Sequence, residues 1–293
     1  MSNNIYISTA TFKTKALDQI LTSCLENQIT NLELGSNIEY SEDIVPLIRK
    51  YNRHPMNFLI HNYFPPHKDE FILNLASDDN ETITRCLEHC YCAIDLSAEL
   101  GIKYFSVHAG YAFKVKSELF GKPITNPSII HYHKAYEIFL RNIKIINDYA
   151  QIKGIKLLIE NHEISHYNLV NGKNSLFLLP TSEELLKFFK DVNSDNLGFL
   201  IDLGHLNVTA HSLKFEPEQF IIDLAPYITI FHLSGNDGSY DRHWKFDQDV
   251  WFKNIIPAFN DRIFVIESWK LEIEEIKECH ACILDMLNKM RKE

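Results

Sequence analysis

The sequence predicts a single (β/α)8 barrel that spans residues 1–293, and three observations support this prediction. Short apolar runs alternate with longer amphipathic segments along the chain, eight such pairs can be counted, and no linker or low-complexity stretch divides them. Eight βα units in a chain of 293 residues match the size of a TIM barrel. A doubly wound sheet would normally have fewer strands and a glycine-rich first turn, which this chain lacks.

The eight predicted strands are short runs rich in Ile, Leu, Val and Phe. They cover residues 5–9, 31–35, 57–61, 103–108, 155–160, 197–202, 228–233 and 262–267. Continuous apolar runs of this length are typical of parallel strands that are buried on both faces of the sheet.

The segments between the strands have the apolar spacing of helices that bury one face. The clearest cover residues 17–25, 136–150 and 276–290, and Thr181 followed by Ser-Glu-Glu predicts a capped helix start. Two connections that follow strands are long, 109–128 and 161–180. Such connections rise from the catalytic face of a barrel, so we expect them to form lids or pocket walls.

Charge and composition narrow the classes of function. The chain has 29 Lys and Arg against 39 Asp and Glu, a net charge of −10, which weighs against a dominant grip on nucleic acid without excluding a local basic cleft. The first residues do not resemble a secretory signal, and no apolar run is long enough for a membrane span. We therefore expect a cytoplasmic protein without a membrane partner, with its six cysteines as reduced thiols.

The most informative feature is a set of imidazoles and carboxylates at or near the ends of the later strands. The set comprises His61, His108, Glu160, Asp202, His205, His232, Asp241, His243 and Glu267. The carboxyl ends of parallel strands form one ring, so we expect these side chains to converge. Converging carboxylates repel one another and become protonated unless a cation lies among them. The pattern therefore predicts a site for a divalent metal ion.

Each of these residues also has an ordinary structural interpretation. A lone His or Asp is more often a helix cap, a surface ion pair or a buried core residue, and Asp202 and Asp241 could each cap the element that follows. Their recurrence at equivalent positions of repeated units favours a metal site over nine separate structural roles.

Four motifs resemble the xylose isomerase-like TIM barrel superfamily, which includes sugar isomerases and epimerases and the endonuclease IV group (AP endonuclease family 2). The motifs are LLIEN (157–161), FLIDLGH (199–205), FHLSGNDGSYDRHW (231–244) and VIES (265–268). The resemblance implies that one divalent ion, Zn or Mn, is held by Glu160, Asp202, His232 and Glu267. It also implies that the catalytic pair, Glu160 and Glu267, exchanges a proton at the carbon next to a metal-polarised carbonyl.

The resemblance leaves two functions open. The favoured hypothesis is an isomerase or epimerase of a small sugar, sugar phosphate or polyol ketone, in which His205 would lie beside the substrate. The alternative is an endonuclease IV-like phosphodiesterase that acts on abasic DNA with up to three zinc ions. Its additional ligand positions match His61, His108, His205, Asp241 and His243.

Departures from the endonuclease pattern favour a small substrate. The stretch STATFKTKALD lacks the glycine pair of that group, while the short loop after the seventh strand and the NLELG of the second resemble the sugar enzymes. A barrel that only binds or supports a partner would need a damaged acid–base pair, and both glutamates are present. The resemblance also makes a homodimer an expectation.

Three residues are candidate substrate contacts. His162 follows the Glu160-Asn161 pair, the guanidinium of Arg242 could receive a phosphate or carboxylate, and Trp269 could form an apolar wall against a sugar ring.

Overall fold

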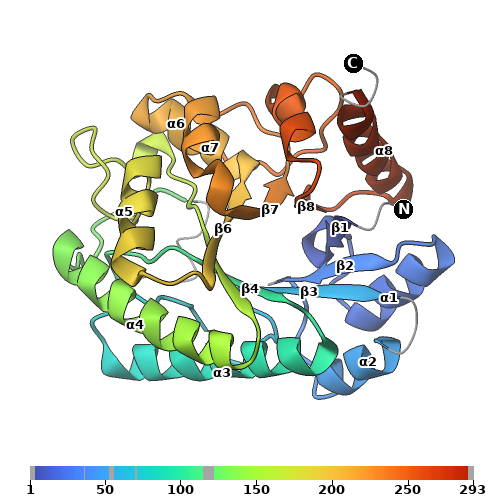
Figure 1. Ribbon diagram of the computed structural model, residues 1–293, viewed down its shortest axis with the longest axis horizontal. Helices are drawn as coiled ribbons and strands as arrows, with labels where there is room; N and C mark the ends of the chain where they lie inside the picture. Colours follow the sequence, from blue (N-terminus) through green and yellow to red (C-terminus); the bar gives the residue numbers. More distant parts are fainter. Residues whose placement is uncertain (1–3, 36, 53–55, 70, 115–121, 290–293) are drawn as a thin grey trace.

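The chain forms a closed barrel of eight parallel strands, as the sequence predicts (Figure 1). The computed structural model describes residues 4–35, 37–52, 56–69, 71–114 and 122–289. The strands are β1 (Ile5–Ser8), β2 (Asn31–Leu34), β3 (Asn57–His61), β4 (Tyr104–His108), β5 (Lys156–Glu160), β6 (Leu197–Asp202), β7 (Ile228–Leu233) and β8 (Ile263–Ile266). They pair in chain order, and β1 closes the barrel against β8.

The described residues contain eight α-helices, which surround the barrel. They are α1 (Leu17–Glu26), α2 (Ile44–Tyr51), α3 (Asn80–Leu100), α4 (Tyr132–Ile152), α5 (Ser182–Val192), α6 (Leu203–Leu213), α7 (Pro217–Leu224) and α8 (Ile273–Lys289). The two longest, α3 and α4, lie side by side along one edge of the molecule (Figure 1). The Thr181 side chain accepts a hydrogen bond from the backbone N–H of Glu184 and caps α5, as predicted.

The helices do not follow the strands one for one. Both α6 and α7 follow β6, whereas the connection from β7 to β8 holds two 3-10 helices, Trp251–Asn254 and Ile256–Phe259. The first part of that connection, 234–249, is rich in Asn, Asp, Gly and Ser and lacks helical apolar spacing. These residue types favour turns over helix because their side chains compete for backbone hydrogen bonds.

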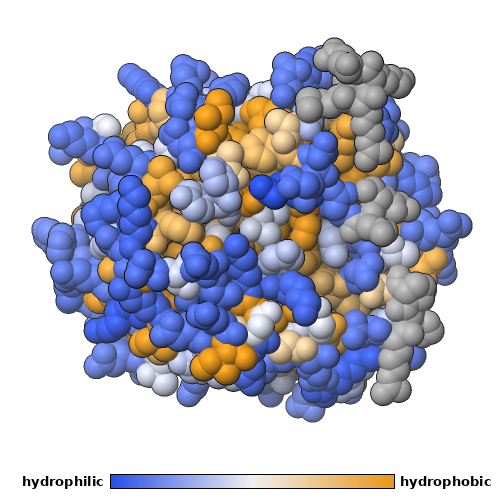
Figure 2. Space-filling model, viewed as in Figure 1, coloured by the Kyte–Doolittle hydropathy of each residue, from blue (hydrophilic) through white to orange (hydrophobic). Residues whose placement is uncertain are grey.

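Large apolar side chains fill the space between the strands and the surrounding helices, where Phe199 contacts Phe189 of α5 and Phe231 contacts Phe259. Phe105, Phe199, Phe231 and Phe264 lie on four different strands and are fully buried. Burial of each contributes roughly 1.5–3 kcal/mol. Figure 2 shows the complementary surface pattern on one face, where apolar residues form small separate groups among hydrophilic ones. None of the described helices has the length and apolar character needed to cross a bilayer. Pairing with a second copy and a location in the cytoplasm stay predictions.

Strand register brings the predicted residues to one level of the barrel. His108 pairs with Glu160 across β4 and β5, and Asp202 pairs with His232 across β6 and β7. Glu267 follows β8 directly, and its backbone N–H donates to the Leu233 carbonyl at 2.9 Å. The register therefore sets the spacing of the polar ring.

One glycine permits the close approach of β7 to the start of α6. A Cβ atom on Gly204 would lie 2.4 Å from the Ser234 Oγ and 3.1 Å from the Asp202 Oδ1. Only a residue without a side chain fits at this point, although a glycine inside a helix costs roughly 0.5–1 kcal/mol relative to alanine.

We expect Gly204→Ala to destabilise the protein, because a steric cost of roughly 1–3 kcal/mol exceeds the gain in helix propensity of about 1 kcal/mol. Urea unfolding of the variant measures the change. Ser234→Ala should restore part of the loss in the double variant, since it removes the atom that the new methyl group meets. A Gly204→Ala protein as stable as the wild type would contradict this account.

Candidate functional site

The predicted residues gather at the carboxyl ends of the strands, around a cavity of about 860 Å3. Seven of the nine line it, whereas Asp202 and His232 are fully buried and are not part of the lining. Barrels keep their binding and catalytic residues at this face. The nine imidazoles and carboxylates predicted from the sequence therefore form one continuous cluster, linked by the contacts described below.

The centre of the cluster is the imidazole of His232, which is completely buried. Its Nδ1 lies 3.1 Å from Glu267 Oε2, 3.8 Å from Glu160 Oε1 and 3.9 Å from Asp202 Oδ2. Four residues that are far apart in the sequence thus place one nitrogen and three carboxylate oxygens within a few ångströms. These are the four that the resemblance singles out as one ligand set.

A second group lies beside the other oxygen of Glu160. Its Oε2 is 3.2 Å from His61 Nε2 and 3.4 Å from His108 Nδ1. His61 is oriented from its far side, because its Nδ1 lies 2.7 Å from the Ser106 hydroxyl, on the paired position of β4.

A third group joins the start of α6 to the loop after β7. Asp241 Oδ2 lies 2.7 Å from His243 Nε2 and 3.4 Å from His205 Nε2. The Nδ1 of His243 donates to the backbone carbonyl of Glu267 at 2.9 Å. The ring of Trp269 stacks on His243 with centroids 4.0 Å apart and planes inclined by 6°. This arrangement connects the third group to the end of β8.

Asp202 performs a structural and a site role with different oxygens. Its Oδ1 accepts from the His205 backbone N–H at 2.8 Å and caps α6, which is the capping role that its sequence position allows. Its Oδ2 is buried and faces His232. Capping therefore does not remove Asp202 from the cluster.

The carboxylates have divergent pKa values. Burial raises the pKa of Glu160 well above its ordinary value, and burial also raises that of Asp202. Burial would raise the pKa of Glu267 too, but the charge and hydrogen bond of His232 outweigh it and lower that pKa well below the ordinary value. Of these two neighbouring glutamates, Glu160 thus favours the protonated form and Glu267 the ionised form.

The histidines also separate into two kinds. Burial lowers the pKa of His61 to about 4 and, together with His162, that of His108 well below its usual range. Burial opposes the charged form of His243 as well, but Asp241 raises its pKa to about 9. In the absence of a metal ion, the cluster balances its carboxylates with protons on some imidazoles and not on others.

The donor set fits a divalent cation. Several buried polar atoms of the described residues make no hydrogen bond, and those in the cluster are Glu33 Oε2, His108 Nδ1, Glu160 Oε2, Asp202 Oδ2 and Asp241 Oδ1. Five overlapping triplets of described residues place their ligand atoms within 4.8 Å of one another. Buried lone pairs without hydrogen-bond donors are costly, and a cation bound by nitrogen and oxygen ligands would satisfy them.

The weaker substrate-contact candidates lie at different depths of the cavity. His162 is buried and stacks on His108, with ring centroids 5.4 Å apart. Arg242 is exposed, and its guanidinium lies 4.7 Å from the Tyr240 ring centroid. All three candidates, His162, Arg242 and Trp269, line the cavity.

The two long connections form the walls of this cavity. Tyr111 and Phe113 from the first and Ile164, Leu176 and Phe177 from the second form a small apolar cluster of their own. The backbone N–H of Ala112 donates to the Leu176 carbonyl at 2.7 Å, which ties the connections together. Residues 115–121 of the first connection lie outside the described part of the chain.

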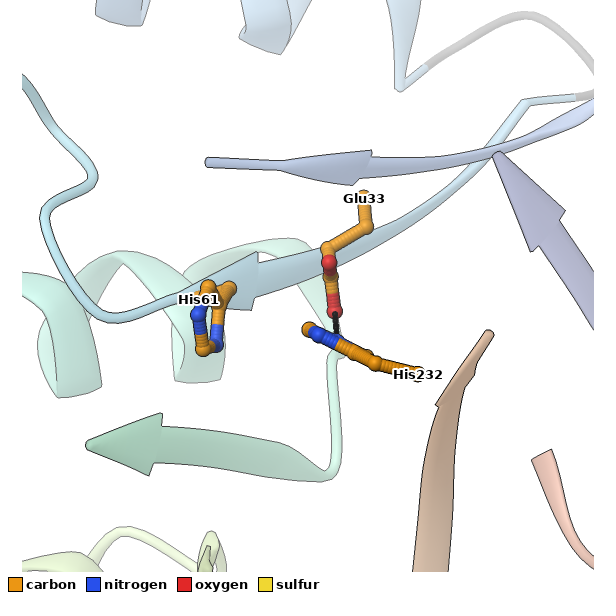
Figure 3. A group of neighbouring side chains, drawn as sticks. All are labelled: Glu33, His61 and His232. Atoms are coloured by element: carbon orange, nitrogen blue, oxygen red, sulfur yellow. Dashed lines mark hydrogen bonds and ion pairs between the residues drawn. The ribbon is translucent and has the colours of Figure 1, made fainter. Parts of the chain in front are cut away.

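One member of the cluster is absent from the sequence prediction. Glu33 is 1% exposed in the middle of β2, and its Oε1 lies 3.0 Å from His232 Nε2. Figure 3 shows its carboxylate directed at His232, with His61 nearby. The available signal is the single acidic residue in the apolar run NLEL, since an ionised side chain inside a buried strand requires a partner.

Comparison with known proteins places the chain in a family. An uncharacterised protein of Methanocaldococcus jannaschii, MJ1311, is 26% identical over 243 residues, which cover 82% of this chain and 73% of that protein. A D-tagatose 3-epimerase-like protein has a similar structure, with a TM-score of 0.73 at 21% identity over 98% of this chain and 99% of its own. An L-ribulose 3-epimerase gives a TM-score of 0.70 at 17% identity, over 98% and 95% of the two chains.

These structural likenesses establish the fold, and the sequence itself establishes the family. Residues 29–284 match the sequence profile described as xylose isomerase-like TIM barrel. The match confirms the superfamily resemblance and covers seven of the eight strands together with the whole polar cluster. The chain belongs to the xylose isomerase-like TIM barrel family.

Proposed function

We propose that the protein is a divalent-metal-dependent isomerase or epimerase that acts on a small sugar, sugar phosphate or polyol ketone. The observation that carries the proposal is the convergence of Glu160, Asp202 and Glu267 on the Nδ1 of His232, where Glu160 and Glu267 also line the cavity. The names of two structurally similar proteins, a D-tagatose 3-epimerase-like protein and an L-ribulose 3-epimerase, support the same class of substrate.

Glu160, Asp202, His232 and Glu267 would hold the ion. Nitrogen and carboxylate donors suit Zn or Mn. When bound, such an ion polarises a substrate carbonyl and acidifies the neighbouring carbon–hydrogen bond.

The two glutamates would transfer the proton. Both side chains line the cavity, so each could reach the carbon next to the carbonyl. Glu267 would accept the proton from that carbon, and Glu160 would return one. In the ion-free cluster the pKa of Glu267 is lowered and that of Glu160 is raised. Neighbouring carboxyl groups whose environments push their pKa values apart are suited to act as base and acid, and they exchange roles in the reverse direction.

The cavity walls would position the substrate and limit access of water. His162 and His205 lie at the deep end, where a substrate hydroxyl could reach them, and Trp269 offers an aromatic face nearer the mouth. A cavity of about 860 Å3 is toward the upper end of the usual range for small-molecule sites, roughly 300–1,000 Å3. It accommodates a monosaccharide with a phosphate or a second group.

Solvent deuterium exchange tests the proton transfer directly. Metal-loaded wild-type protein should incorporate deuterium from D2O at carbon in at least one ketose, inositol ketone or sugar phosphate, as followed by proton NMR. Glu160→Gln and Glu267→Gln should each slow exchange by roughly 10²–10⁴-fold, because each removes a proton-transfer group. Glu99→Gln, on the exposed face of α3, is the matched control and should exchange at the wild-type rate. Absence of exchange across a broad panel would contradict the proposal.

Proton release tests the histidines of the third group. Metal ligation needs deprotonated imidazoles, while Asp241 raises the pKa of His243 to about 9 and that of His205 is also raised. Protons therefore compete with an ion here, and zinc affinity at this group should rise with pH up to about pH 9. If the third group takes an ion of its own, calorimetry of zinc binding in buffers of different ionisation enthalpy will show proton uptake by buffer at pH 7, and less of it in His243→Gln. Equal proton release in both proteins is expected of the one-ion isomerase and would contradict a second ion at this group.

A second candidate function rests on the size of the cluster. All nine predicted residues occur in the triplets of potential ligands, which is enough for more than one ion. This supports the alternative of a multi-zinc phosphodiesterase that acts on abasic DNA, with the net charge of −10 against it.

Metal content and a cleavage assay separate the two functions. Elemental analysis of purified protein should give one ion per chain for the isomerase. Two or three ions, together with nicking of a duplex that contains an abasic site, would instead establish the phosphodiesterase. We expect no nicking above that of a Glu160→Gln control.

A further inference from the structure

Glu33 is a buried acid that the proposed proton transfer does not use. It comes from β2 and contacts Nε2 of His232, whereas Glu160, Asp202 and Glu267 all lie near Nδ1. Its side chain is 2% exposed, and its hydrogen bond to His232 is 3.0 Å long. A carboxylate buried this deeply destabilises the fold unless a partner compensates for its lost hydration with a hydrogen bond or an opposite charge.

The two nitrogens of His232 have different surroundings. Nε2 faces Glu33 Oε1, whereas Nδ1 faces Glu267 at 3.1 Å and the oxygens of Glu160 and Asp202 at 3.8 and 3.9 Å. A neutral imidazole carries hydrogen on one nitrogen and a lone pair on the other. In the ion-free structure each nitrogen has a carboxylate acceptor, Glu33 at Nε2 and Glu267 at Nδ1. When an ion takes the place of the Nδ1 hydrogen, the acceptor at Nε2 keeps the remaining hydrogen on that nitrogen and leaves the lone pair of Nδ1 for the ion.

The ring orientation depends on the same contact. Figure 3 shows His232 extending from β7 toward the carboxylate of Glu33, while the His61 ring lies to one side. The two rings meet edge to face, with centroids 4.9 Å apart and planes at 66°. The directed contacts of the His232 ring are at its two nitrogens, with Glu33 at Nε2 and Glu267 at Nδ1, so Glu33 fixes one end of the ring.

We propose that Glu33 is a positioning residue that fixes the tautomer and orientation of His232, so that Nδ1 is preorganised as a metal ligand. The proposal rests on the proposed function, in which His232 belongs to the ligand set. Partners of this kind, which bond the far nitrogen of a ligating histidine, typically change metal affinity by 10–100-fold when they are removed.

The main alternative is that Glu33 is itself a ligand, since Glu33, His61 and His232 form one of the potential triplets. The Glu33 Oε1 is already engaged by Nε2 of His232, and only its Oε2 lacks a partner. A glutamine side chain separates the two roles. Its carbonyl oxygen still accepts a hydrogen bond from Nε2–H, but it lacks the negative charge of a carboxylate ligand.

Metal affinity provides the first test. Metal-free wild type, Glu33→Gln and Glu33→Leu are titrated with Zn²⁺ against a chromophoric chelator, without substrate. We expect Glu33→Leu to bind the first equivalent 10–100-fold more weakly and Glu33→Gln to stay within a few-fold of wild type. Glu184→Gln is the matched control, because it removes a carboxylate that bonds to the Tyr132 hydroxyl on α4 and lies outside the cavity lining.

The tautomer provides a second test that does not depend on Glu33→Leu. Two-dimensional ¹⁵N NMR of zinc-loaded wild-type protein, with the His232 signal assigned from His232→Gln, should show hydrogen on Nε2 and zinc on Nδ1. Glu33→Gln should keep this pattern. Thermal melting of each variant shows whether it is folded, and the wild-type spectrum still decides the question if Glu33→Leu does not fold.

The outcomes are distinct. Wild-type affinity in folded Glu33→Leu, or hydrogen on Nδ1 in the loaded wild type, would overturn the positioning role. An equal loss of affinity in Glu33→Gln and Glu33→Leu would assign Glu33 as a ligand instead. A wild-type protein that binds no zinc at all would overturn the proposed function itself, which distinguishes that failure from the others.

Discussion

The structure depends on an electrostatic conflict at the open end of the barrel. Parallel strands deliver Glu160, Asp202 and Glu267 to the neighbourhood of one imidazole, where water is too scarce to screen their charges. Without an ion, the conflict is reduced by protonation, which the raised pKa values of Glu160 and Asp202 reflect. The hydrogen bonds from His61 to Ser106 and from His243 to the Glu267 carbonyl hold these two imidazoles in place beside the carboxylates.

The barrel makes this conflict tolerable because its scaffold is rigid and apolar elsewhere. The strands below the polar ring carry fully buried phenylalanines, and the register between neighbouring strands fixes the spacing of the ring above them. A buried charge cluster raises the free energy of the folded state, so a large core must compensate for it. The chemistry at the strand ends therefore depends on the size of the core beneath it.

Much of the fold and the cluster could be predicted from the sequence, because both are encoded by short periodic patterns. Each predicted strand agrees with the structure to within one residue at either end, and the nine polar residues do converge. Glu33 could not be identified in this way. It lies within a strand instead of at its end. Its place in the cluster depends on a contact with His232, which is distant in sequence. The two 3-10 helices before β8 could not be predicted either, because each has four residues and is too short to show a helical period.

The division of labour within Asp202 ties the chemistry to a helix. Its Oδ1 accepts a hydrogen bond from a backbone N–H in the first turn of α6, while its Oδ2 belongs to the polar cluster. Electron density drawn from this carboxylate toward a cation weakens the acceptor available to the helix, and fraying of the helix frees the carboxylate to swing. Binding of a cation at the site and the order of the first turn of α6 are thus thermodynamically linked. Replacement of Asp202 by alanine affects both at once.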